Sequence, residues 1–335
     1  MFDTHGPDKP LSPTSARNSE AHIRQFLDAL VYGGADPTNF KRLSDVVTPK
    51  IIKQGLEAHM RRRDTTQVSG STQNIAATLV VIARDHLKVG QKTMKKIAKI
   101  KARASVPLTG MSPKNVKRLM QFNDKMNIVR LVTLPRIMMD RAKANPENRT
   151  SALLAMRATA ITILLTCPMR VKNLAALDIE RHLVPHRNGT HTIYSMRVEG
   201  LDVKNREPIE FQLNKGNSEV IHRYITTFRR SLSGVRGTAQ FPKLTDGASR
   251  TPGHFGSDLM ACIYRETGIE MNTHLFRHFG AKIYLDTHPG QYETVRRLLK
   301  HKNIQTTIKF YAELNSQHAH DSLSAILTKF GGCDD

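Results

Sequence analysis

The chain has 335 residues, and its 51 Lys and Arg against 29 Asp and Glu give a formal net charge of +22 at pH 7. Its 39% apolar content is enough to bury a core, which excludes a disordered basic tail, and the length suits two domains. A large positive excess on a folded protein favours a polyanionic partner, usually nucleic acid. A basic protein without such a partner is the alternative.

The sequence also excludes secretion and membrane insertion, because it has neither an apolar signal core nor a long apolar segment. Residues 1–17 are polar and contain no apolar signal core. The most apolar stretch, residues 152–166, contains Arg157 and is shorter than the ~18 residues of a membrane span. Cys167, Cys262 and Cys333 are too widely spaced for a disulfide framework or a metal knuckle. We therefore expect a cytoplasmic, nucleoid-associated protein with no membrane partner.

The first part of the chain predicts a small helical domain. Residues 1–18 are expected to be a disordered N-terminal segment. Four segments then carry apolar residues every three or four positions, as on one face of a helix. They are residues 19–32, 48–60, 71–87 and 112–126. We assign them to one helical domain over residues 19–130.

A strongly basic segment, KTMKKIAKIKAR, lies between the last two of these helices. Its cations are Lys92, Lys95, Lys96, Lys99, Lys101 and Arg103. A basic helix face is either a solvated surface or, in a chain this cationic, a surface that faces phosphates. The second interpretation makes these six residues candidates for DNA binding.

The second part of the chain predicts helices around one small sheet. A linker is expected near residues 128–134, and a catalytic domain is expected over 131–330. The predicted helices are residues 135–143, 151–167, 218–231, 257–267, 275–287, 291–301, 305–313 and 318–330. Strands are predicted at 182–186, 190–198 and 208–213, with the turn pair Asn188-Gly189 between the first two. The predicted fold class is mostly α with a small antiparallel β-sheet (α+β).

Several common chemistries lack their motifs. The sequence has no GxxxxGK[ST] loop and no GxGxxG segment after a strand, so nucleotide hydrolysis and dinucleotide binding are not indicated. It also has no HExxH motif and no paired carboxylates for a two-metal nuclease. His274 and His278 are spaced as zinc ligands can be, but no third ligand lies nearby in the sequence. We expect no cofactor and no metal.

What remains is a dispersed set of cations and imidazoles that ends in one tyrosine. In chain order these residues are Arg170, Lys204, His274, Arg277, His301 and Tyr311. Their order, their types and the apolar residues around them resemble the tyrosine recombinases, also called the phage integrase family. The resemblance covers residues 150–315, and its most specific part is HLFRH at 274–278 followed by His301-x9-Tyr311.

The resemblance implies a site for a DNA phosphodiester. Attack on this anion builds charge on its nonbridging oxygens, and a guanidinium can donate to two of them at once. Arg170 and Arg277 would take this role, each lowering the barrier by roughly 3 kcal/mol, and His301 would be an added donor. His274, at the start of its helix, would bind phosphate and handle protons.

The resemblance also assigns the bond-forming groups. Tyr311 would attack phosphorus and hold the 3′ end as a phosphotyrosine, although only about 0.1% of free tyrosine is phenolate at pH 7. Lys204, between two strands, would protonate the departing 5′ oxygen. Because one ester replaces another, neither ATP nor a metal is required.

Three residues depart from the family pattern, and one further residue is ambiguous. Pro168 and Lys300 stand where glycine is usual, and Asn173 stands where an acidic residue is common. These changes affect the geometry of the pocket and the rate more than the identity of the chain. His278, directly after Arg277, has either a packing role or a catalytic one.

The resemblance implies a two-domain clamp on double-stranded DNA recombination sites, with the N-terminal helical domain as the core DNA-binding domain. The amphipathic segment 316–330 would pack on its own domain or dock onto a neighbouring protomer, which is how the family's cyclic homotetramer forms. An accessory DNA-bending protein is a further candidate partner.

We interpret the sequence as a site-specific DNA recombinase, the integrase of a mobile element in a bacterium or archaeon. Two alternatives remain. One is a type IB topoisomerase, which would share the catalytic residues and relax supercoils as a monomer. The other is a DNA-binding protein on the same scaffold that has lost catalysis, which Pro168 and Asn173 make conceivable.

Overall fold

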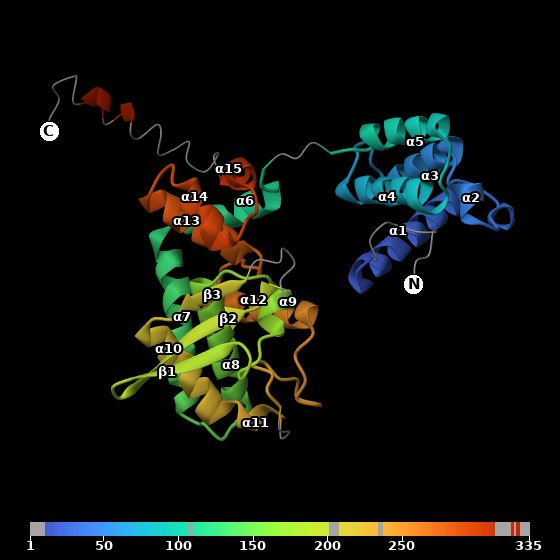
Figure 1. The fold of residues 1–335 in the computed structure, drawn as a ribbon. Helices are drawn as coiled ribbons and strands as arrows, with labels where there is room; N and C mark the ends of the chain where they lie inside the picture. Colours follow the sequence, from blue (N-terminus) through green and yellow to red (C-terminus); the bar gives the residue numbers. More distant parts are fainter. Residues whose placement is uncertain are drawn as a thin grey trace. The chain divides into compact units, whose positions relative to one another are not determined.

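Two compact units, Met1–Leu108 and Thr109–Asp335, make up the chain. The computed structural model describes residues 11–106, 110–200, 208–233, 237–311, 323–324 and 326–328 (Figure 1). Helices dominate the described residues, and three antiparallel strands form the sheet of the second unit. The predicted fold class is confirmed.

The first unit is built from helices alone within its described residues. Its elements are α1 (Pro13–Tyr32), η1 (Pro37–Asn39), α2 (Leu43–Val46), α3 (Pro49–Arg61), α4 (Gly70–Val81), η2 (Ile82–His86) and α5 (Gln91–Arg103). The expected helix at 71–87 therefore ends as an α-helix at Val81 and continues as the π-helical turn η2.

The first helix starts earlier than the sequence predicts. The side chain of Ser12 accepts a hydrogen bond from the backbone N–H of Ser15, and Pro13 occupies the first helical position. The prediction of disorder is therefore wrong for residues 13–18, and residues 1–10 lie outside the described part. A cap and a proline at N1 are sufficient to begin the helix before its apolar stripe starts.

Close approach of two helices defines the core of the first unit. Phe26 of α1 is fully buried and packs with Ile52 of α3, Ile75 of α4 and Ile97 of α5. Gly55 permits the contact between α1 and α3, because a Cβ at this position would lie 2.3 Å from the Phe26 ring. One apolar core thus joins the four main helices.

The second unit contains the sheet and most of the described helices. Its first elements are α6 (Pro113–Met120), η3 (Gln121–Asn123), α7 (Lys125–Lys143), α8 (Arg149–Thr166), α9 (Val171–Ala175), β1 (Leu183–Asn188), β2 (His191–Val198) and β3 (Ile209–Gln212). Then follow α10 (Lys215–Arg223), η5 (Tyr224–Phe228), α11 (Arg230–Ser233), α12 (Pro252–Thr267), α13 (Leu275–Thr287), α14 (Tyr292–Leu299) and α15 (Ile304–Tyr311).

The boundary between the units falls well before the expected one at residue 130. Leu119 and Phe122 are buried in the core of the second unit, and the ring of Phe122 lies 4.6 Å from that of Phe279 in α13. The expected linker at 128–134 is instead part of α7, whose Leu131 and Leu134 are buried. Residues 110–130 thus belong to the second unit, because their apolar side chains are buried there.

Helix α7 also contains Pro135, where the sequence predicts a helix to start. Asp124 caps the helix instead, and the chain stays helical through the proline. Burial of Leu134, Pro135 and Met138 against the core outweighs the missing backbone hydrogen bond.

The three strands lie where the sequence predicts them. The order is β1-β2-β3, and β1 and β2 pair down to Asn188 opposite His191. Gly189, in the two-residue turn, has a φ of +59°, a conformation that glycine adopts without strain. Alternate residues of β2, from Tyr194 to Val198, are buried in the core, and α10 packs on this strand (Figure 1).

No helix among the described residues is long and apolar enough to span a membrane.

Candidate active site

Arg170 is placed by the end of α8. The residue before a proline avoids the helical conformation, and Cys167, before Pro168, is extended, with φ −130° and ψ 94°. The chain therefore leaves α8 at Thr166 and turns, so that half-buried Arg170 becomes the N-cap residue of α9. The proline that departs from the family pattern is thus the residue that makes the turn.

Arg277 lies in the first turns of α13 and joins two other segments. Its side chain is 6% exposed, and its guanidinium donates to the carbonyl oxygen of Pro168 at 2.7 Å and to that of Leu299. Burial, and then the charge of Arg170, lower the pKa of Arg277 to about 10, so it remains protonated at pH 7. The two predicted arginines therefore lie close together.

Two histidines of α13 follow each other by one turn. His274 is the exposed N-cap residue and His278 is 5% exposed, and their rings meet edge to face with centroids 5.1 Å apart. Desolvation lowers the pKa of both imidazoles, that of His278 to about 4. The charge of Arg277 lowers both pKa values further, so neither ring is charged at pH 7 in the absence of an anion.

His301 follows directly after α14. Its backbone N–H donates to the carbonyl oxygen of Arg296, and its Nδ1 shares a 3.0 Å hydrogen bond with Oγ1 of Thr307. Burial and then the cations around it, led by Arg277, lower the pKa of His301 to about 4. The ring is therefore fixed in orientation and neutral.

Tyr311 is the last residue of α15, and its hydroxyl points into the protein. It is 1% exposed, and its Oη lies 2.9 Å from Nδ1 of His278. Burial raises the pKa of this phenol, and the positive charge of Arg277 opposes that shift. The hydroxyl is therefore protonated at pH 7 in this arrangement.

The structure thus brings together five of the six residues predicted from the sequence. They are Arg170, His274, Arg277, His301 and Tyr311, which interact directly or through their charges. Beside the two arginines lies a cavity of about 330 Å³. The sixth residue, Lys204, belongs to the connection between β2 and β3 and lies outside the described residues.

His278 is the residue whose role the sequence left open, and it is the direct partner of Tyr311. Two sequence signals point to it, since it follows Arg277 and is one helical turn from His274. Thr307 gives no comparable signal, because a threonine six residues after a histidine is a common arrangement. Buried Thr307 nevertheless holds the ring of His301.

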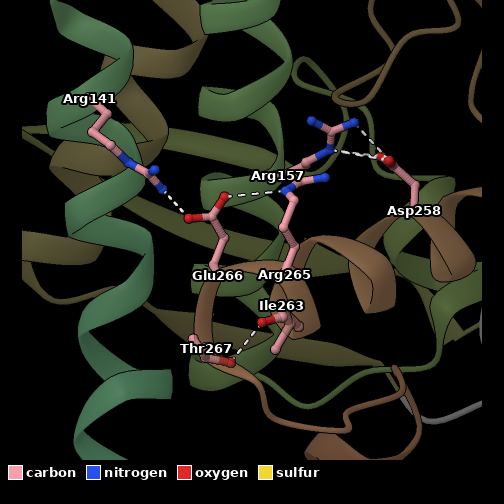
Figure 2. A network of polar contacts seen from close by, with 7 residues as sticks. All are labelled: Arg141, Arg157, Asp258, Ile263, Arg265, Glu266 and Thr267. Carbon is pink, nitrogen blue, oxygen red and sulfur yellow. Dashed lines mark hydrogen bonds and ion pairs between the residues drawn. The ribbon is translucent and has the colours of Figure 1, made fainter.

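Ion pairs attach α12, which packs on α9, to α7 and α8 (Figure 2). Arg157 of α8 donates from Nε and Nη2 to both carboxylate oxygens of Asp258, with distances from 2.7 to 3.2 Å. Arg141 of α7 pairs with Glu266 at 2.5 Å. These contacts hold α12 in place, and α12 packs on α9, the helix whose N-cap residue is Arg170.

A second connection holds the segment before α13. The side-chain amide of Gln121 accepts from the backbone N–H of Glu270 at 3.0 Å and donates to its carbonyl oxygen at 3.2 Å. Arg118 pairs with the carboxylate of the same residue at 3.2 Å. The chain that leads into His274 is therefore held by α6 and η3.

Among the residues that the structure describes, no three His, Cys, Asp or Glu side chains gather as a metal site would require.

The basic segment of the first unit forms the outer face of α5. Ile97 is buried on the inner face, and the cations lie around the rest of the helix. Lys92, Lys95, Lys96, Lys99 and Arg103 are exposed, and Lys101 is half-buried. Helix α5 itself contains no acidic residue.

A profile of the phage integrase family matches residues 110–318, more than half of the chain. The chain belongs to the phage integrase family. The predicted family is thus confirmed, and the matched residues contain all six candidate catalytic positions.

Two solved structures are among those similar to the chain. The XerH site-specific recombinase, bound to a palindromic difH substrate in a post-cleavage complex, is similar with a TM-score of 0.54 and 14% identity over 92% of this chain and 78% of that chain. The Tn1549 transposon integrase in complex with circular intermediate DNA has a TM-score of 0.46 and 13% identity over 91% and 99% of the two chains. The likeness to XerH shows a shared fold. Among curated proteins, no significant match was found.

Proposed function

We propose that this protein is a site-specific DNA recombinase that cuts and rejoins DNA strands through a phosphotyrosine at Tyr311. The observation that carries the proposal is the convergence of Arg170, Arg277, His301 and the Tyr311–His278 pair, of which the two arginines line a cavity. No nucleotide or metal is required, because a phosphodiester to DNA is exchanged for a phosphodiester to tyrosine.

The two arginines of the cavity and the histidines that interact with them suit a bound phosphate. Arg170 and Arg277 donate to the nonbridging oxygens and stabilise the charge that develops there. An entering anion favours the protonated form of nearby imidazoles, so the pKa values of His274 and His301 rise when DNA binds. Both rings can then act as further donors.

The bond changes balance within the chain's own groups. Oη of Tyr311 attacks phosphorus, the P–O5′ bond breaks, and the 3′ phosphate becomes an ester of the tyrosine. The phenolic proton passes to a neutral imidazole of α13, with His278 the nearest acceptor at 2.9 Å. Lys204 protonates the departing 5′ oxygen. The second ester exchange reverses these transfers.

DNA binding and assembly complete the proposal. The exposed cations of α5 contact backbone phosphates, and both units bind the duplex. A homotetramer forms on the DNA by exchange of the C-terminal segment. Most of segment 316–330 lies outside the described residues, and three of its described side chains, Leu323, Ile326 and Leu327, are apolar and exposed.

The test is a nicked suicide substrate that traps the covalent intermediate. We expect a protein–DNA adduct that resists denaturant from the wild type and no adduct from Tyr311→Phe. Tyr284→Phe is the matched control, because it removes an exposed hydroxyl that donates a hydrogen bond to Gln291. We expect this variant to form the adduct as the wild type does. An adduct through another residue would refute the assignment.

The same preparation separates the proposed function from its alternatives. Strand exchange between two defined sites identifies a recombinase, and relaxation of any supercoiled plasmid identifies a type IB topoisomerase. Salt-sensitive DNA binding without covalent product identifies a DNA-binding protein that has lost catalysis.

A further inference from the structure

Lys300, which ends α14, has an unusual backbone conformation. Its φ of +51° and ψ of 47° are left-handed, and among the described non-glycine residues only Asp64 and Lys88 share a positive φ. A side chain with a Cβ is disfavoured in this region, and glycine is the residue that adopts it without cost.

The left-handed turn serves the active site directly. It directs the carbonyl oxygen of Leu299 to the guanidinium of Arg277, and it begins the segment that carries His301. The backbone N–H of Lys300 donates to the carbonyl oxygen of Arg297 at 3.1 Å. Glycine would make the same turn with less strain, so the backbone does not account for the lysine.

Lys300 borders the same cavity as the two arginines. It is half-buried and borders the cavity of about 330 Å³ together with Arg170 and Arg277. Burial raises the pKa of the Cys167 thiol in this cavity to about 12, while the charges of Arg277 and Lys300 act in the opposite direction. The charges of Lys300 and Arg277 therefore act on the same group of the cavity.

The charge of the cavity favours an anion. Four cations border it, namely Arg170, Arg277, Arg297 and Lys300, and the one acidic residue among the described lining residues is Glu210. Arg297 pairs at 3.0 Å with Glu293, which is not among the residues that line the cavity. A cavity with this excess of positive charge attracts a phosphodiester.

We propose that Lys300 is a phosphate-binding residue of the active site, which contacts the DNA phosphodiester held by Arg170 and Arg277. The inference rests on the proposed function. Backbone strain at a functional position is retained when the side chain contributes to binding. The cost of the left-handed lysine is offset when DNA occupies the cavity.

Three substitutions at this position separate charge from strain. Lys300→Gly removes both, Lys300→Gln removes only the charge, and Lys300→Arg removes neither. We expect adduct formation on the suicide substrate to fall about tenfold in the Gly and Gln variants and to be kept in the Arg variant. Only the Gly variant should show a higher Tm, by about 2–4 °C.

A binding measurement tests the contact itself. The slope of log affinity against log salt should be smaller by about 0.9 in Lys300→Gln, as for the loss of one phosphate contact. Lys302→Gln is the matched control, because this lysine is exposed and is not among the residues that border the cavity. It should keep the adduct rate within about twofold, since it lacks the contact.

The outcomes distinguish the two proposals. If the wild type forms no adduct, the proposed function fails. If the wild type forms the adduct and Lys300→Gln matches it in rate and salt slope, the role of Lys300 fails and the proposed function stands. A loss of rate in Lys300→Arg equal to that in Lys300→Gln would also overturn the inference, because charge would then not be the cause.

Discussion

Tyr311 and His278 share a 2.9 Å hydrogen bond between the phenol oxygen and Nδ1, although 33 residues separate them in the chain. Both side chains are buried. Burial lowers the pKa of the imidazole and raises that of the phenol, so a neutral pair is favoured at pH 7.

This neutral pair predicts how stability depends on pH. The pKa of His278 is about 4 in the folded protein, against 6.5 as the ordinary value. Between these values the unfolded chain binds more protons than the folded one, so stability falls as the pH decreases through this window. His278 should account for a loss of about 2 kcal/mol between pH 7 and pH 5.

Urea unfolding at the two pH values checks this prediction. His278→Asn should lose about 2 kcal/mol less than the wild type between pH 7 and pH 5. Tyr311→Phe is the control and should keep the wild-type dependence, because burial, the first cause of the shift, remains. Equal losses in wild type and His278→Asn would contradict the assignment.

Arg277 should be required for both stability and cleavage. Its guanidinium donates to the carbonyl oxygens of Pro168 and Leu299, and a lysine ammonium cannot reproduce this fork. Arg277→Lys should lower the free energy of unfolding by about 3 kcal/mol and adduct formation by about 100-fold or more.

Arg170→Lys is the matched comparison, since Arg170 is only half-buried. Adduct formation should fall to a similar extent, with a loss of stability below about 1 kcal/mol. Normal cleavage by a destabilised Arg277→Lys protein would show that Arg277 has only a structural role.

The ion pair between Arg157 and Asp258 should stabilise the second unit (Figure 2). Both side chains are partly buried and the contact is bidentate, so Asp258→Asn should cost about 1–2 kcal/mol. Glu219→Gln breaks the more exposed pair with Arg223 and should cost less than about 0.5 kcal/mol. Urea unfolding measures both, and equal costs would contradict the prediction.

The cations of α5 should contribute to DNA affinity without affecting the fold. Replacing Lys95, Lys96 and Lys99 together with glutamine should reduce the slope of log affinity against log salt by up to ~2.7. The three side chains are exposed, so the thermal unfolding of the variant should match the wild type. An unchanged salt slope would mean that this face is only a solvated surface.

The elements that could be predicted are those whose signals are local. The hairpin follows from alternating residues on both sides of Asn188-Gly189, and the turn indeed has a positive φ at Gly189. The long helix α8 follows from a continuous run of helix-forming apolar residues that ends at Pro168. Neither element requires knowledge of the rest of the chain.

The boundary between the units could not be predicted, because it depends on tertiary packing. A proline usually marks a helix start, so the sequence predicts a helix from Pro135, whereas the helix begins at Lys125. What makes this helix continuous is burial of Leu131 and Met138 against the second unit's core. No pattern within the segment itself reports that contact.

The residues of the site could be predicted from the sequence, but the contacts between them could not. Chemistry and chain order identify five residues that the structure brings together. The partner of Tyr311 could not be predicted, since the direction of α15 decides whether the hydroxyl faces the cavity or His278. The place of Lys300 could not be predicted either. In the sequence it is only a departure from the family pattern, and the structure places it at the wall of the cavity.

Main-chain oxygens from two separate segments hold the guanidinium plane of Arg277 before any ligand arrives. A long side chain that becomes ordered on binding loses rotamer entropy equivalent to about 1.5–2 kcal/mol. For Arg277 that loss already occurs when the chain folds, so the proposed phosphate site is preorganised and binding to it would not bear this cost.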